Sequence, residues 1–385
     1  MRVLVLNPGS SSLKAAVLEP PDRTPLAAIE LDLGPDASRS AVVAAAVAAA
    51  LDALLAGAGP GTIDAVGYRV VHGGTRFVGP ALIDDEVVAA IDALGALAPL
   101  HNPLAAAAIR AARVALPHAI HVAAFDTAFH AALPEDAVRY AVPSHWAEAW
   151  GVRRYGFHGL SVAWSTRRVA ELLERPVTDL RLVVAQLGSG CSVTAVAGGR
   201  SVETSMGMTP LEGLVMGTRA GSLDPGIIIA LLRDGRRSVE ELAEDLDHRS
   251  GLVGLSGRTS DVRELLAAEA TGDQMARLAL AVFVRRAAAG IAAAATALDR
   301  LDAIVFTGGI GAHAGPVRRR ILDRLAVVGV ERDPAGGFGS GVDHEIADAA
   351  DEPTSGPAIV RIAAREDVVI AEQAASIAAD GLQGA

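Results

Sequence analysis

A β-rich run interrupted by a Gly/Ser turn occurs twice in this 385-residue chain, and this pattern limits the folds open to it. The first copy is a hairpin over 2–18, and its turn reads Asn7-Pro-Gly-Ser-Ser-Ser-Leu-Lys14. The second copy, over 182–199, turns at Gly188-Ser-Gly. A third glycine-rich turn, Gly308-Gly-Ile-Gly, follows a single apolar strand. Backbone N–H groups in such turns cradle phosphate. The pattern therefore predicts two related α/β domains that carry phosphate-binding turns.

Lys14 is the single lysine of the chain, and every other basic residue except histidine is arginine. Lysine is a compact point charge on a flexible stem, whereas arginine is a rigid planar fork, and a crowded oxyanion site distinguishes the two. The position of Lys14 directly after the first turn indicates a phosphate site. The alternative is that Lys14 has no function and is the one lysine that happened not to be replaced by arginine.

The formal net charge of -11 argues against nucleic acid or an anionic membrane as the main partner, since both attract basic patches. A single cysteine, Cys191, excludes an internal disulfide and fits a reducing compartment. The N-terminal run before Asn7 is too short for a signal peptide. We therefore expect a soluble, cytoplasmic protein.

The alanine-rich stretch 41–57 has the length and hydrophobicity of a membrane span, but it contains Asp52, and alanine is a weak lipid anchor. Since alanine favours helix, we expect a buried helix there. Other apolar patterns predict a further set of helices: Val87–Leu94, Pro103–Val114, Ala163–Leu173, Gln274–Leu298 and Val317–Leu325. The acidic, Gly/Pro-rich segment Asp333–Pro357 is expected to be a loop before the last strand, Ala358–Ala363.

Candidate functional residues occur in short polar segments that are flanked by apolar sequence. Asp126 ends an apolar strand, where α/β folds collect functional groups, although capping the next helix is an equal alternative. Arg69, His158 and Arg219 are cations in segments rich in glycine. Each alone could satisfy backbone carbonyls, but together with three glycine-rich turns they indicate a site for several phosphates. A structural zinc site is not expected, whereas magnesium needs only one or two oxygen ligands besides substrate phosphates.

These motifs taken together resemble the acetate kinase family (acetate/propionate kinases). The match extends from Val3-Leu-Val-Leu-Asn-Pro-Gly-Ser-Ser-Ser-Leu-Lys14 to Arg365-Glu-Asp-Val-Val-Ile-Ala371. The resemblance implies the ribonuclease H-like fold of sugar kinases, Hsp70 and actin, with two duplicated α/β domains facing across an active-site cleft. It places the first domain at 1–130 plus 368–385 and the second at 131–367. It also implies a homodimer.

The same resemblance implies a role for each matched residue. Asn7 and Glu366 would hold Mg²⁺, with Mn²⁺ as an alternative, and Ser10, Ser12 and Lys14 would lie near the phosphates. Arg69 would bind the substrate carboxylate. Asp126 matches the catalytic acidic residue, which we interpret as an organiser of magnesium or water, and His158 and Arg219 match the groups that stabilise the transition state. The pocket for the alkyl end would consist of Val71, Leu100, Phe157 and Pro210.

The donor side departs from the family pattern. Its matched residues are Gln186, Leu187, Gly188, Ser189, Gly190, Asp261, Val262, Arg263, Gly309, Ile310, Gly311, Ala312 and His313. Gln186 stands where the family has histidine, Ala312 and His313 replace Glu-Asn, and Val262 replaces an aromatic residue. In the segment after Gly156, Leu160 and Val162 also replace a threonine and a histidine.

The expected reaction is reversible transfer of a phosphoryl group from ATP to acetate, which gives acetyl phosphate and ADP. A carboxylate is already ionised at neutral pH, so it needs positioning and charge neutralisation rather than a strong base. Propionate or another short-chain carboxylate, and a donor other than ATP such as another nucleotide or pyrophosphate, remain alternatives. A non-catalytic nucleotide-binding scaffold of the same fold is a less favoured hypothesis.

Overall fold

A computed structural model describes residues 1–9, 12–34, 40–59, 61–330, 349–351 and 356–383. The chain divides into two compact units. Unit 1 consists of Met1–Ala131, Phe157–Trp164 and Arg365–Ala385, and unit 2 consists of Ala132–Gly156 and Ser165–Ala364. This division differs from the predicted domain boundaries in three places. The first segment of unit 1 ends at Ala131 rather than at residue 130, unit 1 also includes Phe157–Trp164, and its C-terminal segment begins at Arg365 rather than at residue 368.

Unit 1 is built on a six-stranded sheet of order β3-β2-β1-β4-β6-β5. Its strands are β1 (Val3–Pro8), β2 (Ser12–Leu18), β3 (Ala27–Asp32), β4 (Ala65–Val70), β5 (Ala81–Leu82) and β6 (Ile120–Phe125). The first three strands form an antiparallel meander, β1, β4 and β6 are parallel, and β5 pairs antiparallel with β6. The first predicted hairpin is therefore confirmed as β1 and β2.

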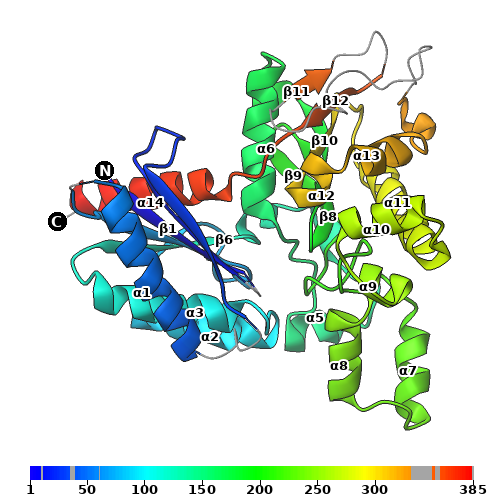
Figure 1. Ribbon diagram of the computed structural model, residues 1–385, viewed down its shortest axis with the longest axis horizontal. Coiled ribbons are helices and arrows are strands. Elements are labelled where there is room, and N and C mark those ends of the chain that lie inside the picture. Colours follow the sequence, from blue (N-terminus) through cyan, green and yellow to red (C-terminus); the bar gives the residue numbers. More distant parts are fainter. Residues whose placement is uncertain (10–11, 35–39, 60, 331–348, 352–355, 384–385) are drawn as a thin grey trace. The chain divides into compact units, whose positions relative to one another are not determined.

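Helices cover both faces of this sheet (Figure 1). One face packs against α1 (Ser40–Gly57), α2 (Asp85–Ala93) and α3 (Asn102–Ala115). Contacts with β1, β4 and β6 place α14 (Glu366–Gln383) against this sheet as well. A Cβ added to Gly67 in β4 would lie 2.6 Å from Ile370 Cγ2, so α14 approaches the backbone of the central strand. Because side chains alternate along a strand, the face next to Gly67 also carries Asn7 of β1 and Arg69 of β4.

Two helices, α1 and α11 (Gln274–Ala295), have the length and hydropathy of membrane spans. Both carry an apolar face that packs inside a unit. In α1 the buried residues Val43, Val47, Ala50 and Leu54 follow helical spacing and join the unit 1 core. The predicted helix at 41–57 is confirmed, but it is buried along one face only, and most of its other residues are exposed.

Unit 2 repeats the strand plan of unit 1. Its strands are β7 (Arg181–Leu187), β8 (Cys191–Ala197), β9 (Arg200–Thr204), β10 (Ala303–Thr307), β11 (Ala349–Asp351) and β12 (Ala358–Arg361). Read from β9, the order is β9-β8-β7-β10-β12-β11, with the same parallel and antiparallel pairings as in unit 1. The predicted duplication of an α/β domain is confirmed by this match.

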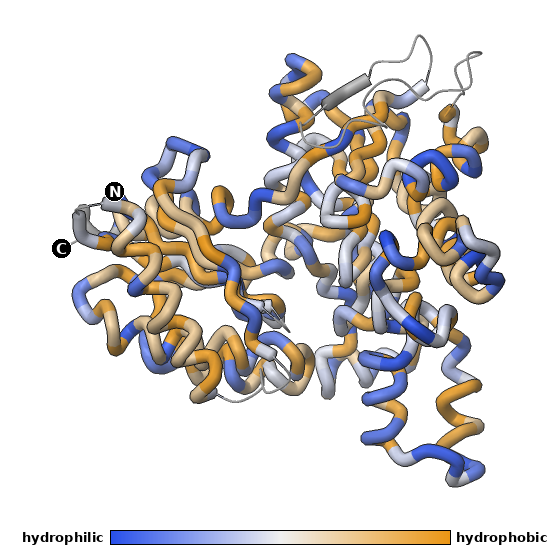
Figure 2. Tube along the Cα trace, viewed as in Figure 1, coloured by the Kyte–Doolittle hydropathy of each residue, from blue (hydrophilic) through white to orange (hydrophobic). Residues whose placement is uncertain are grey.

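The helices of unit 2 lie mainly between the second and third glycine-rich turns. They are α4 (Glu135–Val138), α5 (Ser144–Trp150), α7 (Pro225–Arg233), α8 (Val239–His248), α9 (Gly251–Ser256), α10 (Val262–Ala270), α11, α12 (Gly308–His313) and α13 (Gly315–Leu322). The remaining long helix, α6 (Gly159–Leu172), begins in unit 1 and ends in unit 2. Short 3₁₀ turns occur at Leu94–Ala96, Ala128–His130, Val177–Asp179 and Ala326–Val328. The α7 helix is largely apolar (Figure 2), yet none of its residues is buried.

The predicted loop at Asp333–Pro357 falls mostly outside the described residues. Its described part contains β11, which pairs antiparallel with β12, so the expectation of an irregular segment is wrong there. The surrounding composition, rich in Gly, Pro and acidic residues, hides the strand, because these residue types are depleted in β-strands.

Candidate active site

Four predicted site residues of unit 1 meet at one end of its sheet. Asn7 lies near the end of β1, Arg69 near the end of β4, and Asp126 directly after β6. These strands are parallel, so their carboxyl ends lie at the same edge, which is where α/β folds collect ligand-binding groups. Glu366, the first residue of α14, completes the cluster.

Hydrogen bonds and ion pairs connect this cluster. Arg69 donates to Asp126 Oδ2 from Nη2 at 2.6 Å and from Nε at 3.1 Å. Asn7 donates from Nδ2 to Glu366 Oε2 at 2.9 Å, and its Oδ1 accepts a longer bond of 3.4 Å from Arg69 Nη1. Arg69 Nε also lies 3.8 Å from Glu366 Oε2. The guanidinium is thus held between two carboxylates.

Burial controls the electrostatics of the pair. Asp126 is fully buried, and this burial raises its pKa above the ordinary value, an effect that the Arg69 charge opposes and the Glu366 charge reinforces. Burial alone would lower the pKa of Arg69, but the Asp126 and Glu366 carboxylates raise it above its usual value. Arg69 therefore stays a cation and Asp126 serves as its fixed partner.

The oxygen atoms of this cluster fit a hard divalent cation. Asp126 Oδ1 is buried and has no hydrogen-bond partner among the described residues. The described part of the chain has no group of three or more His, Cys, Asp and Glu side chains arranged for a metal. Magnesium needs no such cage, because it binds through one or two carboxylates, water and substrate phosphates. The donor set of Asn7 and Glu366, with Asp126 nearby, suits that mode of binding.

The first phosphate turn is only partly described. Ser10 lies outside the described residues. Ser12 and Lys14 are in β2, where Ser12 Oγ donates to Glu30 Oε1 at 2.9 Å and Lys14 Nζ lies 3.7 Å from the same oxygen. Lys14 is the register partner of Asn7, so its stem projects from the same face of the sheet. Its side chain is 62% exposed, and an exposed pair such as Lys14–Glu30 holds a lysine only weakly.

Unit 1 also contains three of the four residues predicted for the alkyl pocket. Val71 and Phe157 are buried, and Leu100 is half-buried before α3. Phe157 immediately precedes His158, whose backbone has a φ of 60°, in the left-handed region. The fourth residue, Pro210, belongs to unit 2, where its carbonyl accepts a 2.6 Å hydrogen bond from Arg219 Nη1. Two predicted site residues of one loop, Pro210 and Arg219, are thus connected by a hydrogen bond.

The second and third glycine-rich turns adjoin within unit 2. They follow β7 and β10, which are parallel neighbours with Gln186 opposite Thr307. A Cβ added to Gly308 would lie 2.6 Å from the Leu187 carbonyl oxygen and 2.9 Å from Gln186 Nε2. Gly308 also has a φ of 77°, so glycine is required there for both space and conformation.

Further donor-side residues surround these turns. Gly217 N–H donates to the Ser189 carbonyl at 2.9 Å, which ties the loop before Arg219 to the second turn. Asp261 caps α10 by accepting from Arg263 N–H, and its carboxylate also pairs with the exposed Arg263 guanidinium. Val262 is buried on the inner side of α10.

The third turn continues into α12, which contains Gly309, Ile310, Gly311, Ala312 and His313. Ala312 is buried and His313 is exposed. The buried Arg318 of α13 donates from Nη1 to the carbonyls of Gly311 and Ala312, at 2.8 Å each. Arg318 is a supporting residue of this turn that the sequence analysis did not identify.

Two sets of buried polar residues beside the acceptor side were also missed. Asn102 fixes the loop after β4 through His72 N–H, His72 O and Ile91 O. His130 Nε2 lies 2.9 Å from the Phe157 carbonyl oxygen. Asn102 is one of only two asparagines in the chain, and His130 follows Asp126 by four residues; these were the available signals.

Burial of the Cys191 thiol raises its pKa to about 12, which makes a catalytic thiolate unfavourable there.

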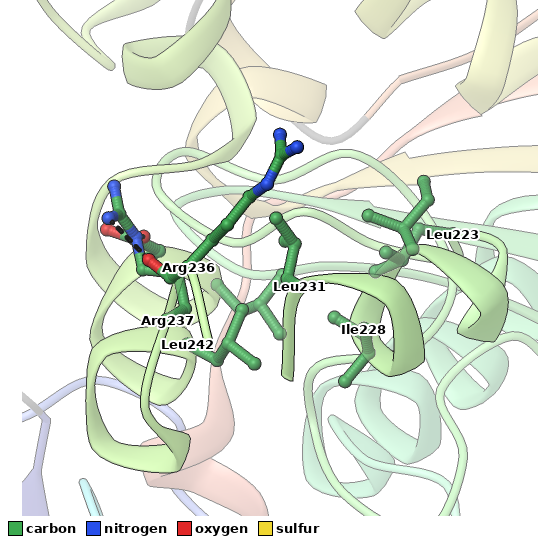
Figure 3. Close-up of a pocket in the computed structure, with 9 residues that line it drawn as sticks. Leu223, Ile228, Leu231, Arg236, Arg237 and Leu242 are labelled. Carbon is green, nitrogen blue, oxygen red and sulfur yellow. Dashed lines mark hydrogen bonds and ion pairs between the residues drawn. The ribbon is translucent and has the colours of Figure 1, made fainter. Parts of the chain in front are cut away.

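A separate hollow of about 340 Å³ lies between α7 and α8 (Figure 3). Its lining is mainly leucine and isoleucine, with Arg236 and the Arg237–Asp245 ion pair as polar members. It includes none of the predicted site residues, and its apolar lining does not suit a carboxylate or several phosphates. The polar ends of the two sheets remain the better candidate.

Comparison with known proteins decides the family. The model of the Acetokinase family matches residues 2–372. This chain belongs to that family, whose members are phosphotransferases with a carboxyl acceptor. Similar acetokinases include the acetate kinase of Deinococcus radiodurans, 50% identical over 86% of this chain and 88% of the relative. The acetate kinase of Deinococcus deserti is 48% identical with the same coverage.

Solved structures of acetokinases agree with the fold. The acetate kinase of Porphyromonas gingivalis matches with a TM-score of 0.84 and 32% identity, covering 98% of this chain and 99% of that one. A propionate kinase from Francisella tularensis matches with the same TM-score and 34% identity, covering 97% and 99%. The two backbone matches are equally good, so the fold does not separate the two acyl substrates.

Proposed function

We propose that this acetokinase is an acetate kinase that transfers a phosphoryl group reversibly from ATP to acetate. The observation that carries the proposal is the part-buried guanidinium of Arg69, held by the fully buried Asp126 at the sheet edge where Asn7 and Glu366 also lie. A fixed, permanently charged fork in a site of this kind is suited to a small carboxylate. The close similarity to curated acetate kinases supports the same reaction.

In the proposed reaction, an acetate oxygen attacks the γ-phosphorus of ATP in line. A new C–O–P linkage forms while the bond between the γ-phosphorus and the bridging oxygen breaks, and ADP leaves with that electron pair. Arg69 orients the carboxylate, and three of its five N–H groups already bond to Asp126 and Asn7, which leaves two N–H groups for substrate. His158 and Arg219 neutralise charge on the transferred group.

Asp126 contributes by fixing the orientation of Arg69 rather than by taking a proton, because acetate arrives ionised. Asn7 and Glu366 would hold Mg²⁺, or Mn²⁺ in its place. When bound, the cation would offset negative charge on the donor phosphates. Val71, Leu100, Phe157 and Pro210 are the residues that we propose for recognition of the methyl group.

On the donor side, Gln186, Ala312 and His313 depart from the family pattern. ATP is our first choice, and another nucleotide or pyrophosphate is the second candidate. Ser10, Ser12 and Lys14 serve the donor phosphates from unit 1. In unit 2 we propose the remaining set: Gln186, Leu187, Gly188, Ser189, Gly190, Asp261, Val262, Arg263, Gly309, Ile310, Gly311, Ala312 and His313.

We further propose a cytoplasmic homodimer with no nucleic-acid or membrane partner. The acidic net charge supports the absence of anionic partners. The exposed apolar side chains of α7 supply a surface suited to a second copy.

Purified protein, Mg²⁺ and acetate should be assayed for acyl phosphate, trapped as the hydroxamate, with ATP, GTP and pyrophosphate as donors. Parallel reactions with propionate and butyrate rank the acyl substrates. We expect acetyl phosphate with ATP at the highest kcat/KM. The absence of acyl phosphate with every donor would refute a kinase activity. A higher kcat/KM with pyrophosphate would identify pyrophosphate rather than ATP as the donor.

The metal role has its own test in Glu366→Gln. The neutral amide keeps the size of the side chain but binds Mg²⁺ poorly, so the Mg²⁺ concentration for half-maximal rate should rise at least tenfold. The KM for acetate should change much less. Asp367→Asn, the adjacent acid paired with Arg365, is the control. An unchanged Mg²⁺ requirement in Glu366→Gln would exclude Glu366 as a ligand.

A further inference from the structure

The turn Phe157–Gly159 carries two residues of the proposed acceptor site and is conformationally strained. His158 has a φ of 60°, in the left-handed region that is unfavourable for a residue with a side chain. Such a conformation persists only where neighbouring contacts hold the backbone on both sides. The contacts that hold this turn therefore also determine where Phe157 and His158 lie.

Two of the contacts that hold the turn come from the short segment Asp126–His130 and lie on either side of His158. Gly159 N–H donates to the Asp126 carbonyl at 2.9 Å. A Cβ on Gly159 would lie 2.1 Å from that same oxygen, so the two backbones are in direct contact. On the other side of His158, the Phe157 carbonyl lies 2.9 Å from His130 Nε2. Because a carbonyl only accepts, Nε2 carries the proton and donates.

The Phe157 ring is held independently of its carbonyl. The His72 ring meets it in an edge arrangement, with centroids 5.3 Å apart and an interplanar angle of 71°. His72 Nδ1 in turn accepts from Gly74 N–H at 2.9 Å, and Asn102 fixes the His72 backbone. Phe157 is thus positioned through its ring by one histidine and through its backbone by another.

His130 has the protonation state that a donor to the Phe157 carbonyl requires. It is 1% exposed, and burial lowers its pKa to about 4, so the imidazole is neutral at physiological pH. A histidine that only filled space could be replaced by an apolar side chain of similar size. A histidine that holds the turn could be replaced only by a side chain with an N–H at the same distance.

We propose that His130 is a positioning residue that fixes the Phe157–Gly159 turn through its Nε2–H bond to the Phe157 carbonyl. In this way it sets the acyl-chain preference of the pocket and the placement of His158. The inference rests on the proposed function, since it assigns a purpose to the turn that carries the acyl and transition-state residues.

The test compares His130→Gln, which keeps an N–H near the position of Nε2, with His130→Leu, which keeps volume but has no donor. The kcat and KM for acetate, propionate and butyrate are measured for both, with His118→Leu, an exposed histidine of the same unit, as control. We expect His130→Leu to lose at least tenfold in kcat/KM for acetate and to shift the acetate-to-propionate ratio at least threefold. His130→Gln should stay within threefold of the wild type in both quantities.

Two outcomes would overturn the proposal. One is equal behaviour of the Gln and Leu variants. The other is a loss in His130→Leu that leaves the acyl preference unchanged, since a merely structural role would lower the rate for all acids alike.

A second measurement, ¹⁵N NMR of histidine-labelled wild type at pH 5–8, does not depend on the folding of any variant. The His130 signals, assigned by their absence from His130→Gln, should show a neutral ring with the proton on Nε2. A proton on Nδ1, or titration in that range, would refute the assignment even if His130→Leu fails to fold. If the wild type makes no acyl phosphate, the proposed function fails. The NMR result still tests separately whether His130 Nε2 donates to the Phe157 carbonyl.

Discussion

At the scale of single residues, rarity in the sequence marked positions where side-chain geometry matters. The chain has two asparagines: Asn7 bonds to Glu366 in the candidate site, and Asn102 makes three buried backbone contacts. At both positions the planar amide acts as a donor and as an acceptor. Lys14, the only lysine, is exposed beside Glu30, and its phosphate role stays a prediction.

Arg219→Lys tests whether a planar fork is needed at the transferred group. Arg219 Nη1 is committed to the Pro210 carbonyl, which orients the guanidinium. Lysine keeps the charge but cannot maintain that bond and span phosphate oxygens together, so we expect kcat to fall about 100-fold or more. Steady-state kinetics check this, with the exposed Arg277→Lys of α11 as control. Near-wild-type turnover would remove Arg219 from the mechanism.

At the scale of elements, the sequence predicted what local pattern can predict. The two hairpins and the helices α2, α3, α6, α11 and α13 were expected because turn residues and apolar spacing are local signals. The short helices α7 to α10 were not predicted, because the segment between α6 and α11 was interpreted as glycine-rich motifs and loops.

In the candidate site, too, some residues could be predicted from local motifs and others could not. Asn7, Arg69, Asp126 and Glu366 were found because they stand in recognisable motifs, and the structure brings them together. Their supports could not be found, because they depend on long-range contacts. His72 and Phe157, for example, are 85 positions apart in the sequence and meet only in the folded unit.

The neutral state of His130 predicts an acid sensitivity of unit 1. Its pKa is about 4 in the folded chain and about 6.5 when unfolded, so its contribution to stability is complete above pH 6.5 and is lost as the pH falls toward 4. The loss amounts to about 3 kcal/mol. His130→Gln has no such titration, so its unfolding midpoint should fall less than that of the wild type between pH 7 and pH 4. Parallel pH profiles for the two proteins would contradict a buried neutral His130.

Close packing of α14 on β4 predicts that Gly67 tolerates no side chain. A Cβ there would lie 2.6 Å from Ile370 Cγ2 and 3.2 Å from the Ile370 carbonyl oxygen. Gly67→Ala should therefore cost about 1–3 kcal/mol of unfolding free energy through overpacking. Denaturant unfolding provides the measurement. Gly79→Ala, where a Cβ meets nothing within 4 Å, is the matched control, and equal stability of the two variants would disprove the close approach.

At the scale of the whole molecule, the two units share one strand plan but differ in how well they keep the family motifs. The first turn retains its family form, whereas the second and third carry Gln186, Ala312 and His313 in place of family residues. A duplicated framework lets one half change while the other is held constant. Donor preference is therefore the property in which we expect this acetokinase to differ from its relatives.

The homodimer proposal has a direct test on α7. Ile227, Ile229 and Leu232 are 50%, 53% and 40% exposed, and apolar surface of this kind is typical of an interface. Ile229→Glu should convert a dimer into a monomer, as measured by light scattering across a concentration series. Val327→Glu, at an exposed apolar residue outside α7, should leave the mass unchanged. A dimer that survives Ile229→Glu would place the interface elsewhere.

The discontinuous make-up of unit 1 also bears on how the protein is made in the cell. Its sheet is encoded in the first third of the chain, but α14, which packs against that sheet and supplies Glu366, is translated only after all of unit 2. A ribosome adding about 5–20 residues per second takes roughly ten seconds or more to cross that interval. During that time the sheet lacks α14. The apolar surface that α14 covers is therefore open to chaperones until the last helix is made, and activity would begin only once residues beyond 365 have left the exit tunnel.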